Sequence, residues 1–257
     1  MSPAVSAKES RRIYPSADET SHAFVEALVQ AAAKRTAQGA LFSLALSGGN
    51  TPRTLLEMLG SPPYVERFPW DHTLFIWGDE RCVPPDDPLS NYGMAMEALL
   101  SRRSIPKAHI LRMRGEGQPE DEALRYEALL RSKLQAVDPV IDWVWLGLGP
   151  DGHTASLFPP LPQSDQAGDR LVLVSDGPRG GPNSVRRITL SYRTLAAARH
   201  LAVLAMGEGK APIIGSLLER PMESPHRYPM DRVRSESRSI AWWLDEAAAE
   251  MLHKRDP

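Results

Sequence analysis

The stretch from Trp143 to Phe158 constrains the fold most, because an apolar run ends there in glycines, a proline, an acid and a histidine. The run Trp-Val-Trp-Leu-Gly-Leu predicts a buried strand whose carboxyl end opens into a loop with Asp151 and His153. In open α/β sheets, ligands bind at the carboxyl ends of the strands. A histidine beside an aspartate in such a loop is a candidate general base with its orienting partner.

Strand patterns alternate with helix patterns along the chain, which indicates a mostly parallel sheet with helices on both faces. We therefore predict a Rossmann-like α/β fold with a single domain over 11–257, preceded by a disordered leader over 1–10. In the helix expected from residue 51, Thr51 fits the N-cap and Pro52 the first turn. The expected strands are 11–14, 41–46, 73–77, 143–148, 171–174, 187–190, 200–206 and 239–244. The expected helices are 18–38, 51–59, 91–100, 120–135, 211–218 and 245–253, with a helical turn at 195–199.

Charge and composition exclude several classes of partner. The chain has 30 Lys and Arg against 32 Asp and Glu, a net charge of -2, so neither nucleic acid nor an anionic membrane surface is expected. No apolar run reaches the roughly 18 to 20 residues of a membrane span. The single cysteine, Cys82, suits a reducing compartment, and the polar first residues show no secretory signal. These features predict a cytoplasmic protein.

A glycine-rich turn between the expected strand 41–46 and the expected helix 51–59 is a candidate anion site. Two glycines let backbone N–H groups approach an anion closely, and the helix N-terminus adds partial positive charge. Because the Gly-Lys-Ser/Thr ending of a Walker A motif is missing, a small phosphorylated metabolite fits better than a nucleoside triphosphate. A plain tight turn is the alternative. The candidate residues are Ser47, Gly48, Gly49, Asn50 and Thr51.

Two better-known motifs are disfavoured. Ser47 lacks the Gly-x-Ser-x-Gly elbow of a hydrolase nucleophile, because Ala45 stands at the first glycine position. The segment 147–152 formally matches Gly-x-Gly-x-x-Gly, and Asp176 follows at about the distance of a ribose-binding acid. That motif requires a helix at its third glycine, yet the prolines within 159–162 leave room for barely two turns. We therefore expect no dinucleotide and no other cofactor.

The pair Asp151 and His153 is suited to acid–base chemistry, because histidine titrates near pH 6.5 and a neighbouring carboxylate fixes its tautomer. A structural histidine at the start of a loop is the alternative. A second charged group, with Asp79 and Arg81, follows the expected strand 73–77. It is either a solvated loop or a part of the same crevice, where Arg81 would hold phosphate or polarise a carbonyl. We expect no metal, because no metal-ligand spacing such as His-Glu-x-x-His is present.

Two further cations stand where a strand or a helix is expected to begin. Arg187 precedes an expected strand, and Lys210 follows Gly-Glu-Gly and opens an expected helix. Such positions suit a bound anion, although each cation taken alone resembles an ordinary surface charge.

Several of these segments, in this order, resemble the glucosamine-6-phosphate isomerase/6-phosphogluconolactonase family, and in particular its lactonases. The resemblance spans about residues 40 to 250. The segments that carry it are Leu-Ser-Gly-Gly-Asn-Thr-Pro (46–52), Trp-Gly-Asp-Glu-Arg-Cys-Val-Pro (77–84), Ser-Asn-Tyr-Gly-Met-Ala (90–95), Gly-Pro-Asp-Gly-His-Thr-Ala-Ser-Leu-Phe-Pro (149–159), Arg-Ile-Thr-Leu (187–190) and Gly-Glu-Gly-Lys-Ala (207–211).

The resemblance implies metal-free hydrolysis of 6-phosphogluconolactone, the second step of the oxidative pentose phosphate pathway, in a Rossmann-like domain. The turn 47–51, Arg187 and Lys210 match phosphate-binding positions, and His153 matches the base that activates water. Asp151 is its neighbour, while Asp79 and Arg81 match the second strand end. The implied partner is a small sugar-phosphate lactone, and we expect a monomer or weak homodimer.

One position separates the two activities of the family. The deaminases have a glutamate five residues after the histidine, whereas this chain has Phe158 there, and no acid lies between His153 and Asp165. This favours the lactonase. The alternatives are a glucosamine-6-phosphate deaminase-like isomerase, or a non-catalytic sugar-phosphate sensor, whose usual DNA-binding domain has no room before residue 11. Arg179 or Arg186 in the long loop 176–186 can share the phosphate with Arg187.

Overall fold

A seven-stranded parallel sheet forms the centre of the molecule in the computed structural model, which describes residues 9–160, 168–178, 184–222 and 224–252. Its strand order is β1-β10-β9-β6-β2-β3-β5, and every pairing is parallel. These strands are β1 (Glu9–Tyr14), β2 (Phe42–Leu46), β3 (Thr73–Trp77), β5 (Ile110–Leu111), β6 (Trp143–Gly147), β9 (His200–Ala205) and β10 (Ile240–Asp245).

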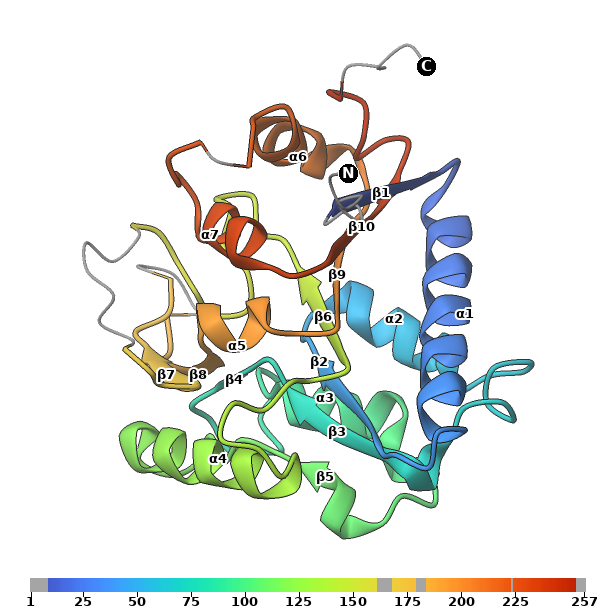
Figure 1. The fold of residues 1–257 in the computed structure, drawn as a ribbon, viewed down its shortest axis with the longest axis vertical. Coiled ribbons are helices and arrows are strands. Elements are labelled where there is room, and N and C mark those ends of the chain that lie inside the picture. The colour runs from blue at the N-terminus through green and yellow to red at the C-terminus, as the bar shows by residue number, and fades with distance from the viewer. Residues whose placement is uncertain (1–8, 161–167, 179–183, 223, 253–257) are drawn as a thin grey trace, which may run out of the picture.

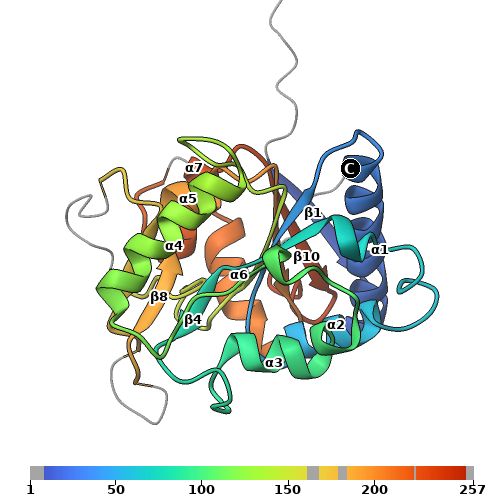
Figure 2. The ribbon, with the colours of Figure 1, turned by 90° about the horizontal axis from the view of Figure 1, so that it is seen from below.

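Helices cover both faces of this sheet, as Figures 1 and 2 show. The first three lie on one face and the remaining four on the other. None of the helices in the described ranges is long and apolar enough to cross a membrane. The helices are α1 (Ala17–Thr36), α2 (Asn50–Leu59), α3 (Asn91–Ala98), α4 (Pro119–Lys133), α5 (Tyr192–Ala196), α6 (Ala211–Leu218) and α7 (Pro229–Glu236).

Strand alternation explains why the sheet is covered on both sides. In β6, Trp143 and Trp145 pack with α1 residues such as Phe24, whereas Val144 and Leu146 belong to the core on the opposite face. Parallel strands with both faces buried read as continuous apolar runs, and β6 is such a run. The fold class predicted from the sequence, a mostly parallel α/β sheet, is confirmed.

A second, antiparallel sheet was not predicted. It has the order β4-β8-β7, with β4 (Asp79–Arg81), β8 (Arg187–Leu190) and β7 (Val172–Ser175). It is joined to the main sheet at Gly78, whose N–H donates to Leu46 O and whose carbonyl accepts from Leu190 N, each at 2.8 Å. The segment 79–81 therefore continues as a strand instead of a solvated loop.

Other differences from the predicted elements occur at their ends. The strand β1 begins at Glu9, so two residues assigned to the leader belong to it, and residues 1–8 lie outside the described ranges. The N-cap of α2 is Gly49, not Thr51. The expected helix 245–253 is wrong, because the chain after β10 forms turns. The Asp245 carboxylate accepts from Gly207 N and Ala248 N, which fixes a turn where a helix would begin. The helix α7 and the strand β5 had not been predicted.

Candidate active site

A cavity of about 310 Å³ lies at the carboxyl ends of β2, β6 and β9 and is closed on one side by β4 and β8. All the predicted site residues except Asp151 line it. The other lining residues come from the same loops, from α3 and from β6 and β9. The cavity is lined by Ser47, Gly48, Gly49, Asn50, Thr51, Pro52, Asp79, Arg81, Asn91, Trp145, Gly147, Leu148, Gly149, Pro150, His153, Ala155, Arg187, Leu204, Ala205, Met206 and Lys210.

The turn 47–51 depends on its two glycines. Gly49 has a φ of 108°, which an L side chain rarely adopts, and it is the N-cap from which α2 departs. Gly48 lies directly against the Asn91 side chain, since a Cβ at position 48 would stand 1.7 Å from Asn91 Oδ1. The turn thus offers backbone N–H groups and a helix N-terminus to the cavity, as an anion site requires.

His153 is held by Asp151 at the cavity edge. Asp151 Oδ1 lies 2.5 Å from His153 Nδ1 and also accepts from the His153 backbone N–H at 3.2 Å. Partial burial of the Asp151 carboxyl opposes its ionisation, but the hydrogen bonds and charge of His153 outweigh that effect, so the pKa of Asp151 is lowered. The contact fixes the tautomer: Nδ1 carries the proton, which leaves Nε2 as the basic atom.

The loop that carries His153 is tightly folded. Gly149 N donates to His153 O at 2.9 Å, and Gly152 N donates to Gly149 O at 3.0 Å. A Cβ at position 149 would lie 2.1 Å from His153 Nδ1. Gly152, with φ of 75°, packs against the Tyr228 ring, which a Cβ would approach to 2.5 Å. The close packing of the backbone in this loop therefore fixes the position of the His153 imidazole.

Phe158 connects the histidine to the opposite side of the cavity. Its ring centroid is 4.6 Å from that of His153, and the Arg187 guanidinium carbon lies 5.4 Å from the Phe158 ring centroid. Position 158 is thus filled by an apolar ring between the His153 imidazole and the Arg187 guanidinium group.

Arg81 and Arg187 are paired residues of β4 and β8, so their guanidinium groups reach the same cavity wall. Arg81 is fixed by a hydrogen bond from Nη1 to Leu89 O, and Arg187 Nη1 is 4.0 Å from Asp79 Oδ2. Burial and the charge of Arg81 lower the pKa of Arg187, while Asp79 opposes this shift. Two cations beside one carboxylate make this wall electropositive.

Three supporting residues were missed by sequence reasoning. Asn91 donates from Nδ2 to Asp79 O at 2.9 Å, and Ser156 Oγ donates to Asp79 Oδ2 at 2.6 Å. Glu80 is buried and accepts from the backbone N–H groups of Arg81, Asn91 and Tyr92 and from Ser90 Oγ. Burial raises the pKa of Glu80, although these backbone hydrogen bonds oppose it. Asn91 and Ser156 occur in the motifs that carried the family resemblance, which was the available signal.

Lys210 lies at the start of α6 and donates from Nζ to Leu148 O at 2.6 Å. Burial lowers the pKa of Lys210, and the negative charge of Asp151 opposes this. Its ammonium therefore enters the cavity beside the loop of His153, from the side opposite β4 and β8.

Not every cation considered from the sequence reaches the cavity. Arg186 binds Glu120 and lies 3.8 Å from Asp176, and it is not among the lining residues. Arg179 lies outside the described residues. Among the residues that the structure describes, no group of three or more His, Cys, Asp or Glu side chains is arranged to hold a metal ion.

Comparisons with known proteins show the family of this chain. Residues 15–242 match the model of the glucosamine-6-phosphate isomerases/6-phosphogluconolactonase family. The 6-phosphogluconolactonase of Haemophilus influenzae is 38% identical over 211 residues, covering 81% of this chain and 87% of the relative. The human 6-phosphogluconolactonase is 36% identical over 246 residues, covering 93% and 92%. The chain belongs to the glucosamine-6-phosphate isomerase/6-phosphogluconolactonase family.

Solved structures of similar proteins have the same fold. The 6-phosphogluconolactonase from Trypanosoma cruzi superposes with a TM-score of 0.81 at 30% identity, covering 96% of this chain and 97% of that one. A monomeric glucosamine-6-phosphate deaminase, 19% identical, has a TM-score of 0.79, which shows that both activities of the family use this fold. The family resemblance read from the motifs is therefore confirmed.

Proposed function

We propose that this chain hydrolyses 6-phospho-D-glucono-1,5-lactone to 6-phosphogluconate, in the second step of the oxidative pentose phosphate pathway. The observation that carries the proposal is a histidine, held by Asp151 in one tautomer, in a cavity with two guanidinium groups. The 6-phosphogluconolactonases among the relatives support the choice of substrate.

The substrate phosphate binds at the turn 47–51, where backbone N–H groups and the α2 N-terminus face the cavity. Lys210 and Arg187 add the positive charge that a phosphate dianion needs. A phosphate placed there leaves the lactone ring among the side chains of His153, Arg81 and Asp79.

His153 then removes a proton from water through Nε2, and the resulting hydroxide attacks the lactone carbonyl. The negative charge that forms on the carbonyl oxygen is stabilised by Arg81. When the tetrahedral intermediate collapses, the ring C–O bond breaks and the protonated His153 returns its proton to the departing ring oxygen. Asp151 stabilises the imidazolium between these two transfers.

The test is lactone hydrolysis measured against the spontaneous reaction, because such lactones open unaided in water. The expected result is acid release well above the buffer rate, with no ammonia released from glucosamine 6-phosphate. Ammonia release would instead establish the deaminase. Binding of the lactone without turnover would establish a sensor.

A further inference from the structure

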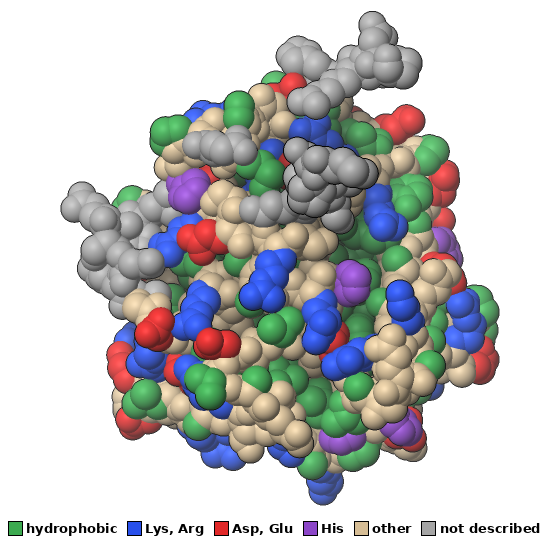
Figure 3. Space-filling model, in the orientation of Figure 1, with side chains coloured by type: hydrophobic (Ala, Val, Ile, Leu, Met, Phe, Trp, Pro, Cys, Tyr) green, Lys and Arg blue, Asp and Glu red, His purple; other side chains and the backbone are tan. Residues whose placement is uncertain are grey.

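A cluster of basic side chains surrounds Asp142 at the amino ends of β2, β6 and β9, opposite the active site. Asp142 directly precedes β6, Arg199 directly precedes β9, and Arg35 lies in the last turn of α1. Lys and Arg side chains gather across the middle of the face shown in Figure 3. Nothing in the proposed reaction uses these residues.

One carboxylate oxygen of Asp142 lies close to two guanidinium groups. Its Oδ1 lies 3.1 Å from Arg35 Nε and 3.0 Å from Arg199 Nε. Its Oδ2 accepts from Ser43 N at 3.0 Å and Ser43 Oγ at 2.9 Å, so this buried carboxylate is fixed to β2. Two positive charges therefore share one negative charge. Each guanidinium group approaches Asp142 most closely through Nε, but Arg35 Nε and Asp142 Oδ1 are buried without a hydrogen-bond partner among the described residues.

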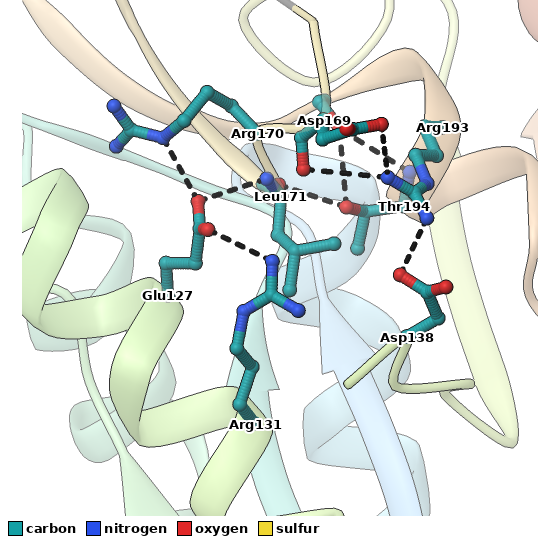
Figure 4. A network of polar contacts seen from close by, with 9 residues as sticks. Glu127, Arg131, Asp138, Asp169, Arg170, Leu171, Arg193 and Thr194 are labelled. Carbon is teal, nitrogen blue, oxygen red and sulfur yellow. Dashed lines mark hydrogen bonds and ion pairs between the residues drawn. The ribbon is translucent and has the colours of Figure 1, made fainter. Parts of the chain in front are cut away.

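Arg193, on the same side of the molecule, shows what a purely structural arginine looks like. Its Nη2 binds Asp138 and its Nη1 lies 3.0 Å from Asp169 Oδ1, so both ends of the guanidinium fork are occupied (Figure 4). The Nη atoms of Arg35 and Arg199 form no such contacts with carboxylates of the described residues. The guanidinium groups of Arg35 and Arg199 are partly exposed, so they are accessible to a ligand from outside the protein.

Two hollows adjoin the cluster and both are lined by Arg35, Asp142 and Arg199. The smaller has a volume of about 150 Å³, room for several water molecules and hence for a phosphate group. Lys34, Gln38 and His200 complete its polar lining. The larger, of about 500 Å³, adds Lys133, and its other carboxylate, Asp138, is already bound to Arg193.

The electrostatics of His200 are consistent with an excess of positive charge. Burial lowers the pKa of His200, Asp142 raises it, and Lys34, Arg199 and Arg12 lower it further. The basic residues in the last turn of α1 also offset the partial negative charge of that helix end, which would otherwise repel an anion.

We propose that Arg35 and Arg199 form a second anion site, which takes a phosphate dianion, either inorganic phosphate or the phosphate group of a small monoester. The planar guanidinium fork matches phosphate geometry, and the charge of Asp142 keeps both guanidinium groups beside it before the ligand arrives. The site stands at the amino ends of the same three strands whose carboxyl ends form the active site.

The test is a titration of ¹⁵N-labelled protein with inorganic phosphate, followed by the amide resonances of two groups of residues. One group is Gln38, Arg199 and His200 beside the proposed site, and the other is the turn 47–51. We expect saturable shifts in the first group, which weaken at least about tenfold in affinity in the Arg35→Gln/Arg199→Gln variant. Arg67→Gln, which removes a paired arginine outside both hollows, should leave them unchanged.

The second anion site and the proposed function are tested by two different groups of amide resonances. An unchanged response of the turn 47–51 in the double variant shows that the variant is folded, and the single variants Arg35→Gln and Arg199→Gln give the same check. A repeat with glucose 6-phosphate and with methyl phosphate distinguishes a monoester from free phosphate. The proposal is overturned if the first group does not shift, shifts equally with chloride at matched ionic strength, or shifts equally in the double variant.

Discussion

The two walls of the active-site cavity are built in different ways. One wall, here called the parallel wall, consists of the turn 47–51, the loop 147–153 and Lys210, all at the carboxyl ends of the main sheet. The other, the antiparallel wall, consists of Asp79, Arg81 and Arg187 on β4 and β8. The parallel wall relies on glycines, a helix N-terminus and Lys210, whereas the antiparallel wall relies on charged side chains that are buried or partly buried.

We expect the two walls to contribute differently to substrate binding and to catalysis. Backbone N–H groups at a helix N-terminus bind an anion equally well before and during the reaction, so we expect the turn 47–51 to contribute mainly to affinity. In the antiparallel wall, Arg187 is proposed to bind the phosphate, whereas we expect Arg81 to stabilise the charge that develops during the reaction. His153, at the edge of the parallel wall and in contact with Phe158, stands where the two meet.

The largest effect should come from substitution of His153, which lies between the two walls. His153→Ala should lower kcat by about 10²- to 10⁴-fold, because the variant has no base to activate water. The measurement is steady-state lactone hydrolysis corrected for spontaneous opening. The control is His72→Ala, since His72 also contacts an aspartate, Asp71, but on the exposed surface. Turnover near the normal value in His153→Ala would remove the proposed base.

A somewhat smaller effect is expected from the antiparallel wall. Arg81→Gln should lower kcat by about 10²- to 10³-fold with little change in KM, as loss of an oxyanion donor does. Arg114→Gln is the control, because this arginine lies outside the cavity lining. A rise in KM at constant kcat would show that Arg81 holds the phosphate, and the proposed division would be wrong.

A substitution in the parallel wall should change mainly KM and not kcat. Lys210→Met should raise KM by about ten- to a hundredfold, the value of a charge-assisted hydrogen bond, and lower kcat less. The same assay over a range of lactone concentrations separates the two constants. Equal losses in kcat and kcat/KM would place Lys210 in the transition state instead.

The glycine of the turn can be tested by adding one methyl group. Gly48→Ala should lower the free energy of unfolding by about 1–3 kcal/mol and raise KM, because the new Cβ displaces Asn91. The measurement is urea unfolding together with kinetics. Gly117→Ala is the matched control, since the nearest atom to a Cβ there is 3.7 Å away. Equal stability and KM in both variants would show that the turn tolerates displacement of Asn91.

The residues of both walls could be predicted from the sequence, but the strand pairing that builds the antiparallel wall could not. The apolar run of β6 and the glycines at 48 and 49 are local patterns, so they predict a strand and a turn directly. The partners of β4 lie in β8, more than a hundred residues away, and no local pattern specifies that pairing. Likewise, the contact of Asn91 with Gly48 depends on how α3 packs, and the Asp245 turn depends on a bond to Gly207.

The smallest expected effect on turnover concerns Cys82, which follows the antiparallel wall and is half-buried. Burial raises the pKa of the Cys82 thiol from 9.0 to about 11, so little thiolate exists at pH 8. Iodoacetamide should therefore label the folded protein about a hundredfold more slowly than the urea-unfolded chain, with activity unchanged. Because the unfolded thiol loses its proton first, stability should fall as the pH rises from 9.0 to about 11, and Cys82→Ser should remove that part of the decline. Labelling of folded protein at the unfolded rate would show that β4 and β8 separate readily, contrary to a wall built on fixed charges.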